Sequence, residues 1–259
     1  GSRAMANQGS LAMAANRYIA TRQVGFLLSY LGTRVLGQYD ISLLAAGPVR
    51  GRLHFVEPNI TSTAMAMRIP RDEFRTFIAL HEVTHAFEFE AHDWLRPYFV
   101  SLVGETIEQL ATESGGLIGR LADAVAGGPG HWLERIMTPA QRETFARTQA
   151  LMSLLEGYSN HVMKAAGRQI LPDFDEIHDR FERRGERRTA LERAIMRLTG
   201  LDLKMEQYAA GERFAAAVMS GRGRDFLNRV WSGPHALPTL AEIAEPQLWI
   251  GRMDRMVGA

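Results

Sequence analysis

The chain lacks several features that would place it in a well-marked class of protein. It contains no cysteine, which excludes disulfide bonds and thiolate metal ligands, so any zinc must be held by nitrogen and oxygen atoms. No apolar run reaches the ~18 residues that a membrane-spanning helix needs. The formal net charge of +1 gives no strong attraction to nucleic acids or acidic membranes. We therefore expect neither a nucleic-acid partner nor a membrane partner.

No basic stretch precedes an apolar one at the amino terminus, so no secretory leader is expected. A cytoplasmic location is the resulting expectation. Residues 1–12 are mostly small or polar and begin with Gly1-Ser2, which we interpret as a disordered or expression-derived start. With 259 residues, 46% of them hydrophobic, and no low-complexity linker, residues 13–259 are expected to form a single domain. The sequence leaves the oligomeric state open.

Three-to-four spacing of apolar residues dominates the chain and predicts a mainly α fold with a short β element. The clearest helix start is Thr138-Pro139-Ala140-Gln141, a capping box with proline at the first helical position. The helix over 72–90 carries apolar residues on more than one side and is expected to be buried. We expect helices over 20–36, 72–90, 97–112, 138–167, 173–199, 203–219 and 222–231, a strand over 51–57, a loop at 127–130 and a loose segment after residue 233.

The stretch HEVTH is the most informative part of the chain. It places His81 and His85 one helical turn apart, so both imidazoles face the same point. Neutral imidazole is a good Zn²⁺ ligand, and Glu82 between the two is positioned to take a proton from a zinc-bound water. The alternative is a pair of hydrogen-bonded core histidines in a buried helix.

A catalytic zinc site needs a third protein ligand, and the chain offers two candidates. His92 follows His85, but the long metzincin motif requires a histidine six residues on, where Ala91 stands. Glu156, which lies 71 residues beyond His85 in Glu156-Gly-Tyr-Ser-Asn160, is the better candidate. A glycine beside it in mid-helix costs about 1 kcal/mol, which indicates a packing or site reason for that stretch. The competing interpretation is that Glu156 is an ordinary solvated helix residue.

This second stretch resembles the ligand helix of thermolysin-type gluzincins, which carries Glu-x-x-Ser-Asp. The resemblance implies that Glu156 binds zinc and that Ser159 matches the motif's serine. Asn160 stands where the motif has an aspartate that holds a zinc-bound histidine. An amide oxygen can still accept the imidazole N–H, although it lacks the charge that raises ligand basicity.

A broader resemblance covers nearly the whole chain. Four stretches are similar to the zincin-like metallopeptidase type 2 family, whose members are often labelled as hydrolases or as deazaflavin-coenzyme-biosynthesis-associated proteins. The resemblance implies a zincin-like helical domain, in which the helix carrying HEVTH packs against a second ligand-bearing helix, and no settled substrate. The stretches are Leu36-Gly-Gln-Tyr-Asp40, Phe55-Val-Glu-Pro-Asn-Ile60, Leu80-His-Glu-Val-Thr-His-Ala86 and Leu155-Glu-Gly-Tyr-Ser-Asn-His-Val-Met163.

These observations predict a zinc-dependent hydrolase, most simply a metallopeptidase acting on a peptide or small amide substrate. The ligands are His81, His85 and Glu156, and Glu82 is the general base. Two alternatives stay open: an inactive binding or scaffold protein with a structural zinc, and a hydrolase of a non-peptide amide or ester. The strand 51–57 could pair with an extended substrate. The donor for the tetrahedral oxyanion is not fixed by the sequence, and the candidates are Tyr158, His161, His178 and Tyr208.

Overall fold

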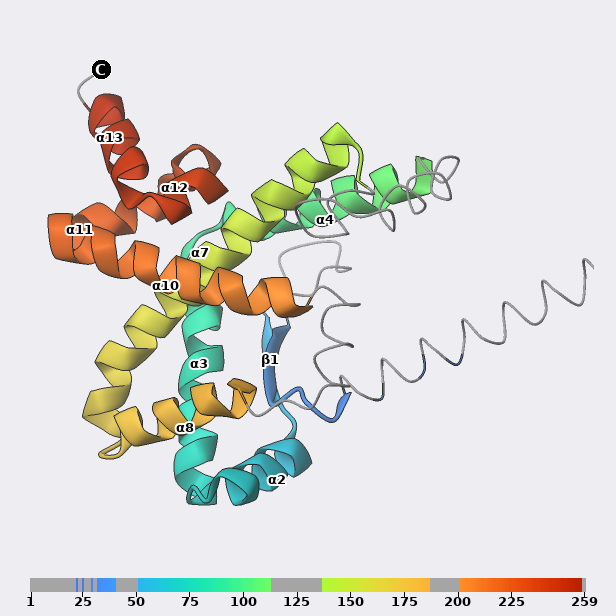
Figure 1. Cartoon of the computed structure of the whole chain (residues 1–259), viewed down its shortest axis with the longest axis vertical. Helices are drawn as coiled ribbons and strands as arrows, with labels where there is room; N and C mark the ends of the chain where they lie inside the picture. Colours follow the sequence, from blue (N-terminus) through green and yellow to red (C-terminus); the bar gives the residue numbers. More distant parts are fainter. Residues whose placement is uncertain are drawn as a thin grey trace, which may run out of the picture.

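The computed structural model describes residues 32–40, 51–112, 137–186 and 201–257, together with Arg22, Gly25 and Ser29. The side chains of 110–112, 185–186 and 201–208 are not described. The fold is mainly α, as the sequence predicts (Figure 1). The start at 1–12, the loop at 127–130, most of the 20–36 helix and the end of the 173–199 helix lie outside the described residues.

The described helices and strands follow one another as β1 (Gly37–Asp40), β2 (Arg52–Phe55), α2 (Glu57–Met67), α3 (Arg71–Ala91), α4 (Leu95–Thr112), α7 (Pro139–Ile170), α8 (Phe174–Glu186), α10 (Leu201–Arg222) and α11 (Arg224–Leu227). Two short 3₁₀ helices, η2 (Asn228–Ser232) and η3 (Pro234–Ala236), lead to α12 (Leu240–Ala244) and α13 (Pro246–Val257). None of the helices in this part of the chain has the length and apolar character needed to cross a membrane.

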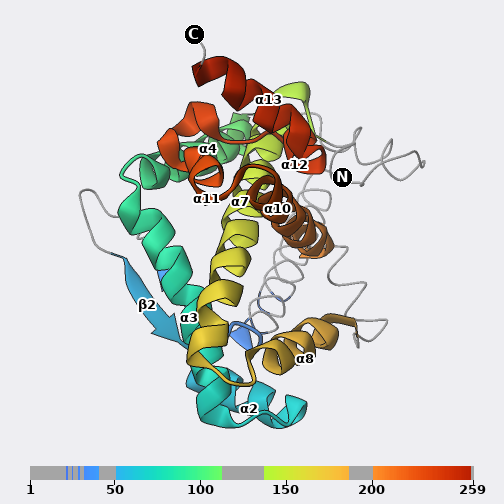
Figure 2. The same cartoon turned by 90° about the vertical axis from the view of Figure 1, so that its left-hand side faces the viewer.

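Helix α7 is the central element, with α3 on one side of it and α10 on the other (Figure 2). Its start is the predicted capping box: Gln141 N donates to Thr138 Oγ1, and the Gln141 side chain accepts from Thr138 N. The predicted stop at Gly167 is wrong, because α7 continues to Ile170. Gly167 instead leaves room for the ring of Phe174, which would lie 2.2 Å from an added Cβ.

The crossing of α7 and α10 is unusually close. A Cβ added at Gly157 of α7 would lie 2.0 Å from the carbonyl carbon of Gly211, and one added at Gly211 would lie 1.7 Å from the carbonyl oxygen of Ser153. Since both atoms are backbone atoms, neither can move without its helix. The two glycines therefore set the distance at which α10 passes over α7.

The strands form an antiparallel two-stranded sheet that packs on α3, with Gly37 opposite Phe55 and Asp40 opposite Arg52. The strand is shorter than the predicted 51–57. The strand ends at Phe55, and α2 begins two residues later. This helix was not predicted from the sequence, because Pro58 was taken as the close of the strand, whereas it lies in the first turn of α2. The Tyr39 hydroxyl donates to Glu90 of α3 and ties the hairpin to that helix.

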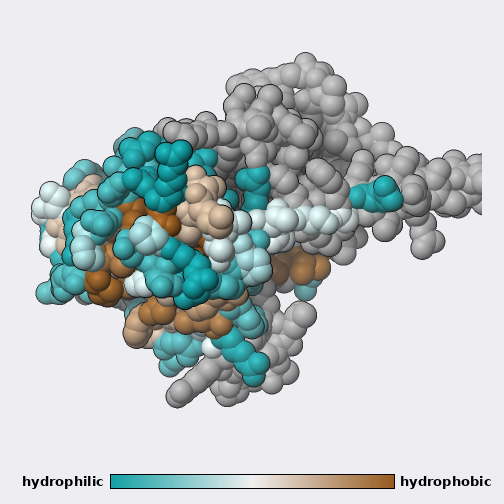
Figure 3. Space-filling model, turned by 90° about the horizontal axis from the view of Figure 1, so that it is seen from below, coloured by the Kyte–Doolittle hydropathy of each residue, from teal (hydrophilic) through white to brown (hydrophobic). Residues whose placement is uncertain are grey.

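Two hydrophobic clusters hold these elements together. One surrounds Phe74 and Phe77 at the start of α3 and includes Phe174 of α8. The burial expected of the α3 helix is correct for these residues but wrong for Phe87, which is 69% exposed. The lower face, near α2 in Figure 1, mixes apolar residues with hydrophilic ones (Figure 3).

The second cluster joins α4, α7 and α10 to the C-terminal helices, and it corrects the expectation of a loose segment after residue 233. Trp249 of α13 is fully buried and donates its indole N–H to the carbonyl of Ala236. A second capping box at Thr239 begins α12, and its Glu242 also pairs with Arg252. The prolines of this segment lie in or next to short helices rather than in a free chain.

Candidate metal centre

Helix α3 places His81 and His85 on one face, as the HEVTH spacing predicts. Their ring centroids lie 4.7 Å apart with an interplanar angle of 89°. Glu156 reaches the pair from α7: its Oε2 lies 3.9 Å from His81 Nε2 and 3.6 Å from His85 Nε2. Ligands of a tetrahedral zinc with bonds of about 2.0–2.2 Å lie roughly 3.4 Å apart. The two distances from Glu156 exceed that spacing by about 0.5 and 0.2 Å, so small side-chain movements would bring the carboxylate to bonding distance.

One ligand atom from each of these residues lies within 4.8 Å of the others. All three are only partly buried, so solvent can reach the site. The donor set of two imidazole nitrogens and one carboxylate oxygen is the kind that binds catalytic zinc. Within the described part of the chain this group has three members, which is the number of protein ligands that catalytic zinc sites use.

Glu88 fixes the orientation of His85. Its Oε2 lies 2.8 Å from His85 Nδ1, so that nitrogen donates to the carboxylate and Nε2 is left as the ligand atom. The contact follows from an i, i+3 spacing on α3. Glu88 is not among the site residues predicted from the sequence, although its i, i+3 spacing from His85 is a usable signal.

The electrostatics of this pair favour a cation at the site. Burial lowers the pKa of His85, but hydrogen bonds to Glu156 and Glu88 outweigh burial and raise that pKa to about 10. Burial also raises the pKa of Glu88 to about 7, against the effect of its bond to His85. Two carboxylates around a buried imidazole thus bind a proton strongly. A metal cation in place of that proton would relieve the same excess of negative charge.

Glu82, the predicted general base, is 8% exposed and lies between α3 and β1. A Cβ added at Gly37 would lie 2.7 Å from both Cγ and Oε1 of Glu82. The glutamate therefore occupies space that any larger residue at position 37 would take. The sequence analysis assigned Gly37 to the end of a helix, whereas it begins β1.

Asn160 has partners other than those expected. Its Nδ2 donates to Glu212 Oε2 at 2.6 Å, and its Oδ1 lies 3.3 Å from His178 Nε2. Lys164 pairs with the other oxygen of Glu212. Asn160 thus joins α7 to α8 and α10. The role expected of it, to orient a histidine of the HEVTH pair, belongs to Glu88, which holds His85.

The remaining candidates lie in different surroundings. Tyr158 donates its hydroxyl to Asn228 Oδ1 at 2.9 Å, and burial raises its pKa. His161 lines a cavity with Tyr158. His178 is 6% exposed and packs against the aromatic cluster of α3 and α8, which leaves it little access to a substrate. The side chain of Tyr208 lies outside the described part.

His92, the rejected third ligand, stacks on Trp231 with ring centroids 4.9 Å apart. Trp94 donates its indole N–H to the carbonyl of the same tryptophan. Both residues pack the end of α3 against η2.

Comparison with known proteins identifies the family of the chain. The family model described as Zincin-like metallopeptidase matches residues 2–250. A solved structure described as "a putative hydrolase with a novel fold from Chloroflexus aurantiacus" is 46% identical, with a TM-score of 0.66, and the match covers 90% of this chain and 68% of that one. No curated protein matches. Family and structural neighbour both indicate a hydrolase, and the chain belongs to the zincin-like metallopeptidase family.

Proposed function

We propose that the protein is a zinc-dependent hydrolase that cleaves an amide bond of a peptide substrate. The observation that carries the proposal is the convergence of His81 and His85 from α3 with Glu156 from α7. These residues would hold Zn²⁺, which supplies a water of lowered pKa and polarises the scissile carbonyl.

The charges around the site support a divalent cation. The carboxylates of Glu88 and Glu156 both lie against His85, 2.8 Å from its Nδ1 and 3.6 Å from its Nε2, and are largely buried. Burying carboxylates this close together is costly unless a cation balances their charge, which favours a divalent ion at the site. Glu88 holds His85 in the tautomer that leaves Nε2 for the metal.

The chain supplies the proton transfers. Glu82 accepts the proton of the attacking water and then gives it to the leaving amine. Its position against Gly37 restricts its rotamers, which favours a fixed geometry for that transfer. Strand β2 is exposed along its whole length, so an extended peptide could add to this sheet.

The test combines metal analysis with turnover. Purified wild-type protein should contain one zinc per chain, and it should hydrolyse members of a fluorogenic peptide library. Glu82→Gln should keep the zinc and reduce turnover at least a hundredfold, since general acid–base catalysis contributes about 10²–10⁴-fold. The matched control is Glu245→Gln, which changes an exposed glutamate on the C-terminal side of the molecule and should leave both values unchanged.

Ligand variants separate the proposal from its alternatives. His81→Ala and Glu156→Ala should lose stoichiometric zinc, whereas His54→Ala, an exposed histidine on β2, should retain it. Full zinc content in Glu156→Ala would remove that residue from the ligand set. If the protein binds zinc but hydrolyses no peptide, ester or small amide, the result would favour a structural role for the metal. If it hydrolyses only esters or small amides, the proposed peptide substrate would be wrong.

A further inference from the structure

A cavity of about 340 Å³ lies on the side of α7 that faces away from Glu156. Around the helix axis, the α7 residues that line it are rotated by roughly 140–280° from Glu156. The cavity is therefore distinct from the metal centre. Its lining residues on α7 are Tyr158, His161, Val162, Ala165, Ala166 and Gln169.

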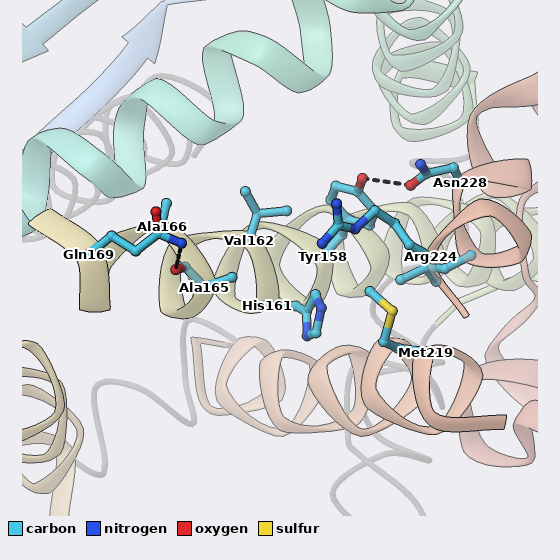
Figure 4. Close-up of a pocket in the computed structure, with 10 residues that line it drawn as sticks. Tyr158, His161, Val162, Ala165, Ala166, Gln169, Met219, Arg224 and Asn228 are labelled. Carbon is cyan, nitrogen blue, oxygen red and sulfur yellow. Dashed lines mark hydrogen bonds between the residues drawn. The ribbon is translucent and has the colours of Figure 1, made fainter. Parts of the chain in front are cut away.

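The other walls of the cavity come from the end of α10 and from the two short helices that follow it. Met219 belongs to α10, Arg224 and Leu227 to α11, and Asn228 to η2. Figure 4 shows Tyr158, Arg224 and Asn228 gathered at one end of the cavity and Gln169 at the other. The lining is thus apolar along most of its length, with the neutral Gln169 at one end and the cationic Arg224 at the other.

The charge at that end is a single positive one. None of the ion pairs found in the described part of the chain includes Arg224, whose side chain is exposed. The nearby Glu212 is already paired with Lys164, so these two charges cancel. Burial lowers the pKa of His161, with Arg224 and Lys164 acting in the same direction against Glu212. A neutral His161 can donate one hydrogen bond.

We infer that this cavity is a second binding site, which takes a small carboxylic acid with an apolar body. A guanidinium presents paired N–H groups that match the two oxygens of a carboxylate. The Asn228 amide can add a donor, because its oxygen already accepts from Tyr158. One cation matches a monoanion, and the volume falls within the range of about 300–1,000 Å³ that is usual for small-molecule sites.

The experiment is a titration of the full-length protein with 4-phenylbutyrate, followed by ¹H–¹⁵N chemical shifts. The uncharged 4-phenylbutanol is the comparison ligand. We expect saturable binding of the acid with a Kd on the order of millimolar or tighter, and binding of the alcohol at least tenfold weaker. Arg224→Gln should weaken the acid at least tenfold, whereas Arg213→Gln, which changes an exposed arginine on α10, should not. Ala166→Phe, which fills the cavity, should abolish binding of both ligands.

The metal centre could also bind a carboxylate, so the titration is repeated on His81→Ala. Unchanged binding there supports the cavity, and loss of binding assigns the ligand to the metal and overturns the inference. Equal affinity for acid and alcohol, or no saturation in wild type at several times the expected Kd, also overturns it. If Arg224→Gln and Arg213→Gln behave alike, the proposed role of the guanidinium is wrong.

Discussion

Gly157→Ala should destabilise the protein, although alanine is the better helix former. The new Cβ would lie 2.0 Å from the carbonyl carbon of Gly211, and ordinary contact begins at 3.4 Å, so α10 must retreat by about 1.4 Å. Overpacking of a fitted interior costs about 1–3 kcal/mol. Because the clash is with backbone atoms, we take the upper end of this range as the cost. Alanine recovers ~1 kcal/mol of it through its better helix propensity. The expected net loss is about 2 kcal/mol.

Thermal and urea unfolding measure this effect. A loss of this size lowers the Tm of a domain this large by roughly 4–8 °C. The control is Gly221→Ala in α10, where an added Cβ meets no described atom within 4 Å. That variant should be neutral or slightly more stable. If Gly157→Ala were as stable as Gly221→Ala, the close crossing of α7 and α10 would not exist in solution and the argument from it would fail.

Three further predictions concern individual contacts. Glu88→Ala should weaken zinc binding about 10–100-fold by competition with a chelator, because His85 loses the acceptor that orients it; unchanged affinity would contradict this. Gly37→Ala should keep the zinc but lower turnover by about a hundredfold, because Glu82 must move; normal turnover would show that Glu82 adapts without cost. Burial raises the pKa of Glu242, but hydrogen bonds from the Arg252 guanidinium and from a backbone amide lower it by more, so the pKa of the folded protein lies below 4.5. The ionised Glu242 therefore stabilises the fold at neutral pH, and this stabilisation is lost as the pH falls from 4.5 through the lowered pKa. Between pH 6 and 3 the Tm of Glu242→Gln should therefore fall less than that of wild type, and parallel curves would exclude this pairing as a source of acid sensitivity.

The sequence predicted the long helices well because their signals are local. Apolar spacing and the Thr138 capping box depend on residues within one or two turns, and α3 and α7 begin within a residue or two of their predicted starts. The errors occur where tertiary contacts decide. Proline and glycine near Pro234 were taken as signs of a loose segment, yet burial of Trp249 holds that segment in short helices. The helix over 72–90 was expected to be buried, yet Phe87 is exposed, because periodicity alone does not say which faces of a helix are covered.

The site could be predicted in part for the same reason. His81 and His85 are one turn apart, so the spacing alone brings their rings together. The meeting with Glu156 across 71 residues depends on how α3 packs on α7, and only the resemblance to known ligand helices indicated it. The glycine at 157 was a true signal of packing, but its partner Gly211 is invisible without the crossing of α7 and α10.

The asparagine at position 160 has a physical explanation in this packing. Its Nδ2 donates to a carboxylate oxygen of Glu212 at 2.6 Å, and an aspartate has no hydrogen to donate there when ionised. Two carboxylates at that distance repel, so one of them would have to take up a proton or move. An ionised aspartate at this place would therefore be repelled by Glu212 on α10, whereas the asparagine amide donates to it. In this chain the carboxylate that holds a histidine N–H lies instead on α3, as Glu88, one turn from the residue that it orients.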